Sequence, residues 1–285
     1  MLNQKTSDLF TVIRKDRYKS SDGGEQIEHI WHPDYELFWI SEKILEWYYN
    51  DEFGIIIVHG QQGFGKSTYA CISGAEVYGH NRMKHEFYYN WDAVKKHIVW
   101  TPRDFIKLSK KRDQGKEPYE HKEPLVIWDD AGYWLNAMDF RDKLCITVSK
   151  YLEVARTRWA AIIFTVSDQR QILSKIRGIP HAWSIPIIKA STPGVHNPNY
   201  KWVHDRRYAH LHKSWVSEDL KKSGKKGQEG DVFYARMPPK FYRWYKAFRD
   251  RFCMDAIEDV DKAEKESKLT PPHQNDLLKT EQLID

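Results

Sequence analysis

The chain has few cysteines, no long hydrophobic run and no internal repeat, and each absence excludes a class of protein. Its three cysteines, Cys71, Cys145 and Cys253, are far apart and show no metal-ligand spacing. Such a set excludes a disulfide framework and favours a reducing compartment. No apolar stretch approaches the roughly 20 residues of a membrane-spanning helix, and the N-terminus lacks the apolar core of a signal peptide. We therefore expect a soluble, cytoplasmic protein without a membrane span.

What the chain does contain is enough apolar sequence for a substantial core. Hydrophobic residues make up 41% of the 285 residues, and the 12 tryptophans are unusually many. This length suits one large α/β domain, or one core with modest additions. Aromatic side chains can fill a core, stack on nucleic-acid bases or build interfaces, and composition alone does not choose among these.

A glycine-rich loop follows the apolar run Ile55–His59 and precedes a helical pattern over Tyr69–Tyr78. Glycines allow the backbone to curl until several N–H groups point at one phosphate, and the following helix presents its positive N-terminal end. The spacing matches a phosphate-binding loop, in which Lys66 reaches the β- and γ-phosphates and Ser67 ligates Mg²⁺. The sequence therefore predicts binding of ATP and Mg²⁺ by Gly60, Gln61, Gln62, Gly63, Phe64, Gly65, Lys66, Ser67 and Thr68.

A second apolar run, Leu125–Trp128, ends in two carboxylates. An acid at the carboxyl end of a strand beside the loop strand can hold Mg²⁺, usually through a water. We assign this metal-binding role to Asp129. Asp130 is the candidate that polarises the attacking water. That role is commonly filled by Glu, so the shorter side chain needs a closer water or a shifted backbone.

Apolar strand patterns alternate with helical patterns, which predicts an α/β fold with a parallel sheet covered by helices on both faces. The long interval between Ser67 and Asp129 favours the additional-strand class of P-loop NTPase, in which another strand separates the two motif strands. The strands are expected at Ile55–His59, Leu125–Trp128, Ala160–Val166 and Trp183–Ile188, with a weak one at Glu86–Tyr89. Pro186 makes the Trp183–Ile188 strand an edge strand or a shorter one.

Helical patterns cover residues 35–50, 69–78, 92–98, 143–155 and 169–176, and another helix begins at Pro102 with Thr101 as its cap. The expected organisation is an N-terminal segment with an amphipathic helix over 1–50 and an ATPase core over 51–190. A basic, aromatic extension follows over 191–260, as a small β-hairpin and a helix. An acidic tail over 261–285 is expected to be disordered.

Arginines and small polar residues flank the strand expected at Ala160–Val166. Arg156 and Arg158 lie before this strand, where either could reach a neighbouring subunit's site as an arginine finger or simply complement a helix C-terminus. Arg177 is a third candidate. The γ-phosphate sensor is expected at the end of the strand, from Ser167 or from the neighbouring candidates Thr165 and Gln169.

Positive charge and aromatic side chains are interleaved after residue 200. Residues 201–249 carry 13 Lys/Arg against 5 Asp/Glu, whereas residues 250–285 carry 5 against 10. Phosphate contacts combined with stacking surfaces are typical of nucleic-acid binding, so DNA is the predicted partner of 201–249, through backbone contacts without sequence preference. A Lys/Gly-rich loop over 220–230 adds a flexible polycation. The alternative is a small aromatic core with a solvated, charged face.

The stretch Trp128–Leu135 resembles the second motif of P-loop ATPases encoded by archaeal spindle-shaped viruses and related plasmids, and so do Val154–Arg158 and Lys175–Arg177. These proteins are often described as DnaA-like and stand near the AAA+ and HerA/FtsK-type motors. The resemblance covers about residues 54–180. It implies an additional-strand ATPase core that works as an oligomer on DNA, in replication, copy-number control or packaging. The C-terminal helix-turn-helix of an initiator is not evident, which favours DNA handling without sequence specificity.

Three functions remain open from the sequence. The first is an oligomeric, Mg²⁺-dependent ATPase of a virus or plasmid that acts on DNA in replication, partition or packaging. The second is an assembly or morphogenesis ATPase that acts on protein partners. The third is a phosphotransferase on a small substrate, for which Lys110–Arg112 is the only hint of an arginine-bearing lid.

Overall fold

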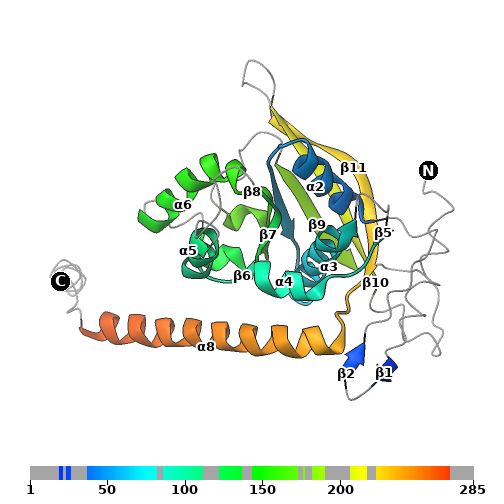
Figure 1. The fold of residues 1–285 in the computed structure, drawn as a ribbon. Helices are drawn as coiled ribbons and strands as arrows, with labels where there is room; N and C mark the ends of the chain where they lie inside the picture. The colour runs from blue at the N-terminus through cyan, green and yellow to red at the C-terminus, as the bar shows by residue number, and fades with distance from the viewer. Residues whose placement is uncertain are drawn as a thin grey trace, which may run out of the picture. The chain divides into compact units, whose positions relative to one another are not determined.

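The sheet at the centre of the fold has seven strands in the order β11-β10-β9-β3-β8-β7-β6 (Figure 1). The computed structural model describes residues 19–21, 24–26, 37–81, 86–111, 122–136, 143–172, 176, 182–189, 206–216 and 223–269. The strands are β3 (Gly54–His59), β6 (Ile98–Val99), β7 (Glu123–Trp128), β8 (Trp159–Val166), β9 (Trp183–Lys189), β10 (Arg206–Val216) and β11 (Ser223–Tyr234). The chain divides into two compact units, Met1–Met237 and Pro238–Asp285, and the sheet belongs to the first.

The strand order is that of an additional-strand P-loop NTPase. Strand β8 pairs in parallel with both β3 and β7, so it separates the strand of the glycine-rich loop from the strand that ends in Asp129. The inserted strand therefore comes from after Asp129 in the chain. The weak strand expected near residue 86 lies outside this sheet, because β5 (Glu86–Phe87) pairs only with β4 (His80–Asn81). A second small pair joins β1 (Lys19–Ser21) and β2 (Gly24–Gln26).

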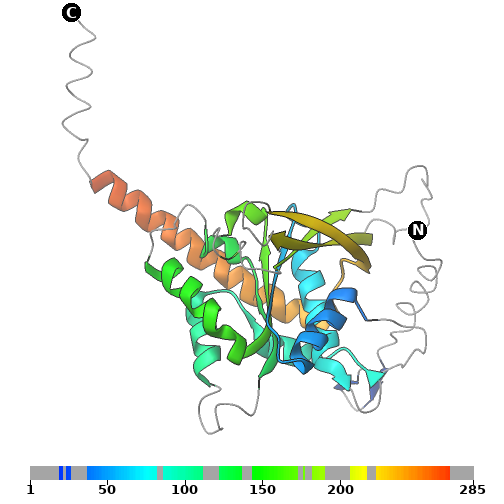
Figure 2. The same ribbon diagram turned by 90° about the horizontal axis from the view of Figure 1, so that it is seen from above.

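Helices cover both faces of the parallel strands (Figures 1 and 2). One face carries α2 (Trp39–Tyr49), α3 (Lys66–Gly79) and α4 (Trp91–His97), and the other carries α5 (Pro102–Lys111) and α6 (Lys143–Val154). Helix α5 begins as the sequence predicts, with Pro102 in its first turn and the Thr101 hydroxyl accepting from the N–H of Asp104. In a strand, successive side chains point to opposite faces, so strands that are covered on both sides read as continuous apolar runs.

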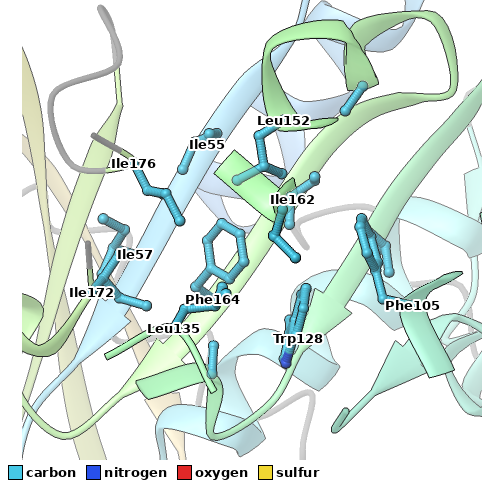
Figure 3. Close-up of a cluster of buried hydrophobic side chains, with 14 of the residues drawn as sticks. Ile55, Ile57, Phe105, Trp128, Leu135, Leu152, Ile162, Phe164, Ile172 and Ile176 are labelled. Atoms are coloured by element: carbon cyan, nitrogen blue, oxygen red, sulfur yellow. The ribbon is translucent and has the colours of Figure 1, made fainter. Parts of the chain in front are cut away.

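The core between the sheet and helices α5 and α6 is mostly aliphatic, with aromatic rings from Phe105, Trp128, Trp159 and Phe164 among its isoleucines and leucines (Figure 3). The Trp128 ring lies 5.0 Å from the Phe105 ring and 6.0 Å from the Phe164 ring, measured between centroids. On the opposite face, Gly74 of α3 lies so close to Ile127 that an added Cβ would stand 3.0 Å from its Cδ1 atom. This close approach seats α3 directly on the sheet. Five tryptophans, Trp47, Trp100, Trp128, Trp159 and Trp183, are buried.

Strand β9 is not an edge strand, because it pairs with β3 on one side and with β10 on the other. The edge position expected from Pro186 is therefore wrong. Proline lacks the N–H that a ladder needs, and it is tolerated inside a sheet at a bulge. The β9–β10 ladder passes directly from the pair Ala209↔Ile187 to the pair His212↔Ser184. Separately, β10 shifts its register against β11 between His210 and His212. Pro186 lies where the β9–β10 ladder has no pair, between Ile187 and Ser184.

Two further expectations from the sequence fail. Strand β11 begins at Ser223, so Lys225 and Lys226 lie in an antiparallel ladder with β10 instead of a loop over 220–230. Over residues 169–172 the expected helix is absent, since Gln169–Gln171 is a 3-10 turn and Ile172 forms a β-bridge with Asn136. Residues 173–175 lie outside the described part, and Ile176 is helical. Asp168 caps this turn by accepting from the N–H of Arg170.

The second unit contains one long helix, α8 (Pro239–Leu269). The disorder expected from Asp261 does not begin there, since α8 continues through residue 269. Side-chain pairs at helical spacing, Lys246 with Asp250 and Lys262 with Asp259, are of the kind that supports a charged helix. Residues 270–285 lie outside the described part. Among the described helices, none has both the length and the apolar character needed to cross a bilayer.

Two buried carboxylates from other elements hold the start of α2. The N–H of Phe38 donates to Glu76 of α3 at 3.0 Å, and the N–H of Trp39 donates to Asp231 of β11 at 2.8 Å. Asp231 also accepts from the Tyr69 hydroxyl of α3. Helix α2 has no side-chain cap of its own, so these contacts satisfy its first N–H groups and join α2, α3 and β11.

This cluster gives folding stability a specific pH dependence. Burial raises the pKa of the Asp231 carboxyl from 3.8 to about 6, against the lowering effect of its hydrogen bonds from Tyr69 and Trp39. The folded protein therefore holds the proton more tightly than the unfolded chain. The contribution of Asp231 to the free energy of unfolding falls, by roughly 3 kcal/mol, as pH rises from about 4 to above 6.

We predict that Asp231→Asn removes this slope, because Asn does not titrate. Urea unfolding of the parent and the variant at pH 4 and pH 7 measures the difference, and other titrating groups cancel in the comparison. An identical change in the two proteins between these pH values would contradict the prediction.

Candidate phosphate-binding site

Three glycines give the loop after β3 its shape. Gly60, Gly63 and Gly65 have φ angles of 144°, 74° and 92°, which side-chain-bearing residues rarely adopt. Close contacts add a second constraint at two of them. A Cβ on Gly60 would stand 2.7 Å from the carbonyl oxygen of Ile187, and one on Gly65 would stand 2.9 Å from the Cβ of Ala235. The loop thus requires glycine both for its backbone conformation and for its fit against β9 and the end of β11.

Lys66 is buried at the first position of α3, with 8% of its surface exposed. Its Nζ atom donates to the carbonyl oxygen of Gln61 at 3.1 Å, across the loop. The ammonium group is thereby held over the backbone that curls around the N-terminus of α3. This end of the helix concentrates unsatisfied N–H groups and positive potential, which together suit an anionic phosphate.

Asp129 follows β7 and is completely buried, at 0% exposure. Its Oδ1 atom accepts from the Thr165 hydroxyl at 2.6 Å, and its own N–H donates to the carbonyl oxygen of Val99 at 2.9 Å. The same Thr165 oxygen accepts from the N–H of Asp130 at 2.9 Å. One hydroxyl on β8 therefore orients both successive acids at the end of β7.

The residues around Asp129 fit Mg²⁺. Burial raises the pKa of the Cys71 thiol of α3, and the charge of Asp129 raises it further. Ser67 stands one helical turn before Cys71, on the same face of α3. A hydroxyl and a carboxylate that share this edge with a phosphate loop are the oxygen ligands that Mg²⁺ takes alongside phosphates and water. Ser67 and Asp129 are the side chains that would hold it.

Asp130 has a left-handed backbone conformation, with φ 51° and ψ 37°, at the start of a 3-10 turn over Ala131–Tyr133. Non-glycine residues adopt this region seldom, and Asp and Asn do so more readily than most. A shifted backbone is what the proposed role of Asp130 would need with its shorter side chain. The left-handed conformation turns the chain sharply, directly after Asp129.

The sequence reasoning missed a polar chain beside the loop. The Nε2 atom of His59, at the end of β3, lies 2.9 Å from the Ser184 hydroxyl of β9. That hydroxyl donates to Oε1 of Gln169 at 2.9 Å. The signal was available, because Ser184 is a polar residue inside the apolar run Trp183–Ile185.

The sensor candidates divide into three environments. The Thr165 hydroxyl is engaged with Asp129, so Thr165 orients the carboxylate. Ser167 is exposed at the end of β8, and its carbonyl oxygen accepts from the N–H of Gly60 at 3.2 Å. Gln169 belongs to the chain with Ser184 and His59. Ser167 and Gln169 therefore lie at the same edge of the sheet as the loop.

Arg156 and Arg158 lie at the opposite end of the parallel strands from the phosphate loop. They precede β8, whose eight residues span roughly 26 Å before the edge that carries the loop. Arg156 lies near enough to Asp51, which precedes β3, to help lower the pKa of that carboxyl after the larger effect of Lys122. Neither arginine joins the loop of its own chain. Arg177 lies outside the described residues.

Comparison with known proteins finds two virus proteins. The chain is 28% identical over 142 residues to uncharacterized protein B-251 of Sulfolobus spindle-shape virus 1, covering 50% of this chain and 54% of that protein. It is 26% identical over 186 residues to uncharacterized protein ORF286 of Acidianus two-tailed virus, covering 63% and 59% respectively. The chain thus spans less than two thirds of the length of either relative. No family model matches the chain.

Two solved structures are also similar. One is the N-terminal domain of zonular occludens toxin from Neisseria meningitidis, with 14% identity, a TM-score of 0.33, and coverage of 67% of this chain and 98% of that one. The other is the genome packaging NTPase B204 from Sulfolobus turreted icosahedral virus 2 in complex with ATP-γS, with 10% identity, a TM-score of 0.31, and coverage of 61% and 96%. The P-loop NTPase fold of this chain follows from its own strand order and loop.

The shared hydroxyl of Thr165 yields a direct test of the site's geometry. We predict that Thr165→Val lowers the free energy of unfolding by about 1–3 kcal/mol, because it leaves a buried Asp129 oxygen and the Asp130 N–H without their partner. Mg²⁺-dependent nucleotide binding should weaken as well. Thr165→Ser keeps the hydroxyl and is the matched control. Equal unfolding free energies for the Val and Ser variants would contradict this role.

Proposed function

We propose that the chain is a viral ATPase that binds ATP with Mg²⁺, hydrolyses it, and works as an oligomer on DNA. The observation that carries the proposal is the pairing of two features at one edge of the sheet. These are the glycine-shaped loop with buried Lys66, and the buried Asp129 held beside α3 by Thr165. Similarity to proteins of two viruses supports the viral origin.

Each residue has a role in this proposal. The loop N–H groups and the N-terminus of α3 bind the phosphates, and Lys66 exchanges its bond to Gln61 for the β- and γ-phosphate oxygens. Ser67 and Asp129 hold Mg²⁺, which when bound neutralises charge on the transferring phosphate. Asp130 orients the attacking water and accepts its proton. Ser167, which follows β8, would contact the γ-phosphate. Gln169 and its partner Ser184 of β9 would support this contact.

A partly exposed face of the hairpin supports the choice of DNA. Arg206, Tyr208, His210 and His212 alternate along β10 and so point to one side of the sheet. The Arg206 guanidinium lies 5.3 Å from the Tyr208 ring centroid, and His210 is exposed. Cations beside an aromatic ring provide phosphate contact and base stacking together, and neither depends on sequence.

The position of Arg156 supports an oligomer with shared sites. It is exposed at the edge of the sheet opposite to its own loop. An arginine in this position can stabilise charge on a phosphate only in a neighbouring subunit. Arg158, two residues on, is the second candidate for the same role. Such a site is complete only when two chains meet.

Hydrolysis assays test the proposed activity. The parent should hydrolyse ATP in the presence of Mg²⁺, faster when DNA is added, and DNA stimulation should fall as salt rises. Lys66→Ala should lose hydrolysis by about 100-fold or more, since it removes a preorganised charge at the phosphate. Hydrolysis by Lys66→Ala at the parent's rate would contradict the site. A rate that DNA leaves unchanged would contradict the DNA role and favour the assembly ATPase.

Mixing two inactive variants tests the shared site. Arg156→Ala lacks the trans arginine but keeps its loop, whereas Lys66→Ala lacks the loop cation but keeps Arg156. We predict that mixed oligomers recover part of the parent's ATPase rate, because some interfaces then combine an intact loop with an intact arginine. Arg103→Ala, an exposed arginine on α5, is the control and should behave as the parent. If the mixture stays as inactive as its components while the two variants co-assemble, Arg156 does not act in trans.

A further inference from the structure

Helix α8 carries opposite charges on its two halves. Residues 240–252 contain five basic side chains and one acidic one, whereas residues 253–265 contain five acidic side chains and two basic ones. The halves meet near Cys253, so the helix is a charged rod with a positive N-terminal half and a negative C-terminal half. The helix macrodipole favours the reverse arrangement, with acidic residues near the N-terminus. The charge pattern is therefore not explained by stabilisation of α8 itself.

The same helix leaves apolar side chains in solvent. Phe248, Met254, Ile257 and Val260 are 39, 57, 53 and 67% exposed. Phe252, Ala256 and Val260 follow one another at four-residue spacing, and Phe248 and Ile257 flank them. Residues four apart lie on neighbouring turns of one helix face, so they form an apolar strip along the middle of α8. The strip begins at Phe248 in the basic half and ends at Val260 in the acidic half.

We propose that α8 pairs in antiparallel orientation with α8 of a second copy of this chain. Antiparallel pairing centred near Phe252 places the basic half of each helix along the acidic half of the other. The strips then cover each other, and a two-fold axis makes one patch serve both partners. Parallel pairing would instead set basic beside basic and acidic beside acidic, at a cost for every like-charged pair.

Charge pairs within one helix do not remove this complementarity. Lys246 pairs with Asp250, and Lys262 pairs with Asp259, at spacings of four and three residues. These contacts are local, and exposed pairs of this kind contribute only a few tenths of a kcal/mol. Each half keeps an excess of one sign, positive over residues 240–252 and negative over residues 253–265. This pairing involves neither the phosphate loop nor Arg156, and it stands independently of ATP hydrolysis.

Charge reversal on the full-length protein tests the pairing. Lys246→Glu, Arg249→Glu and Arg251→Glu together leave two basic and four acidic side chains in residues 240–252, so both halves become acidic. The dissociation constant of the dimer should then rise about tenfold or more at low salt. Adding Asp255→Lys, Glu258→Lys and Asp259→Lys leaves five basic and two acidic side chains in residues 253–265. The signs of the two halves are then exchanged, which should restore the parent's dissociation constant. Arg103→Glu, Lys107→Glu and Lys110→Glu on α5 change the net charge by the same amount as the first variant and should leave the dimer intact.

Sedimentation equilibrium without nucleotide measures the dissociation constants, and circular dichroism checks that α8 remains helical in each variant. We expect the parent to form a dimer that added salt weakens. The dimer should lose affinity in the first variant and recover it in the second. A parent that stays monomeric at high micromolar concentration and low salt would overturn the proposal. So would a dimer whose affinity is equal in the parent and the first variant. Loss without recovery in the six-residue variant would overturn the antiparallel orientation.

Discussion

The parallel pairing of β3, β8 and β7 is the constraint on which the candidate site depends. Parallel strands that are paired in register end at the same edge of a sheet. Here that register brings the loop after His59, the polar residues after Val166 and the acids after Trp128 together. Nothing in the sequence separation of these segments would otherwise join them. The Thr165 hydroxyl then links the ends of β8 and β7 by binding Asp129 and the Asp130 N–H.

The rest of the first unit holds this edge in place. Helix α3 is buried along almost its whole length, and Tyr69 and Glu76 tie it to Asp231 and to the start of α2. The Phe233 ring lies 5.2 Å from the Tyr69 ring, and Ala235 lies against Gly65 of the loop. The phosphate loop is therefore in direct contact with the end of β11. A change in the loop on nucleotide binding would reach the hairpin that carries the basic, aromatic face on β10.

Local patterns predicted the parts of the structure that depend on local chemistry. The loop, the four parallel strands with long apolar runs, and the Thr101 cap of α5 are such parts. Their determinants are glycine conformation, burial on two faces and side-chain capping, which are legible over a few residues. The additional-strand class was also predicted, although from a weak strand near residue 86 that lies outside the sheet. The order was right because β8 is inserted between β3 and β7.

What the sequence could not supply depends on partners far away in the chain. Pro186 looked like an edge residue, because the gap in the ladder that accommodates it forms only when β10 pairs with β9. The role of Thr165 depends on Asp129, 36 residues earlier, and Asp231 meets Tyr69 only once the hairpin has joined the sheet. Lys225 and Lys226 looked like loop residues, because strand propensity is low for Lys and Gly. Their pairing with β10 overrides that propensity.

Calorimetric titration of ATP into the full chain is the most direct test of the central claim that this edge is a nucleotide site. The account predicts one ATP bound per chain in the presence of Mg²⁺, much weaker binding in the presence of EDTA, and loss of binding in Lys66→Ala. Binding of equal affinity to the parent and Lys66→Ala would contradict it, as would no binding by a folded parent protein.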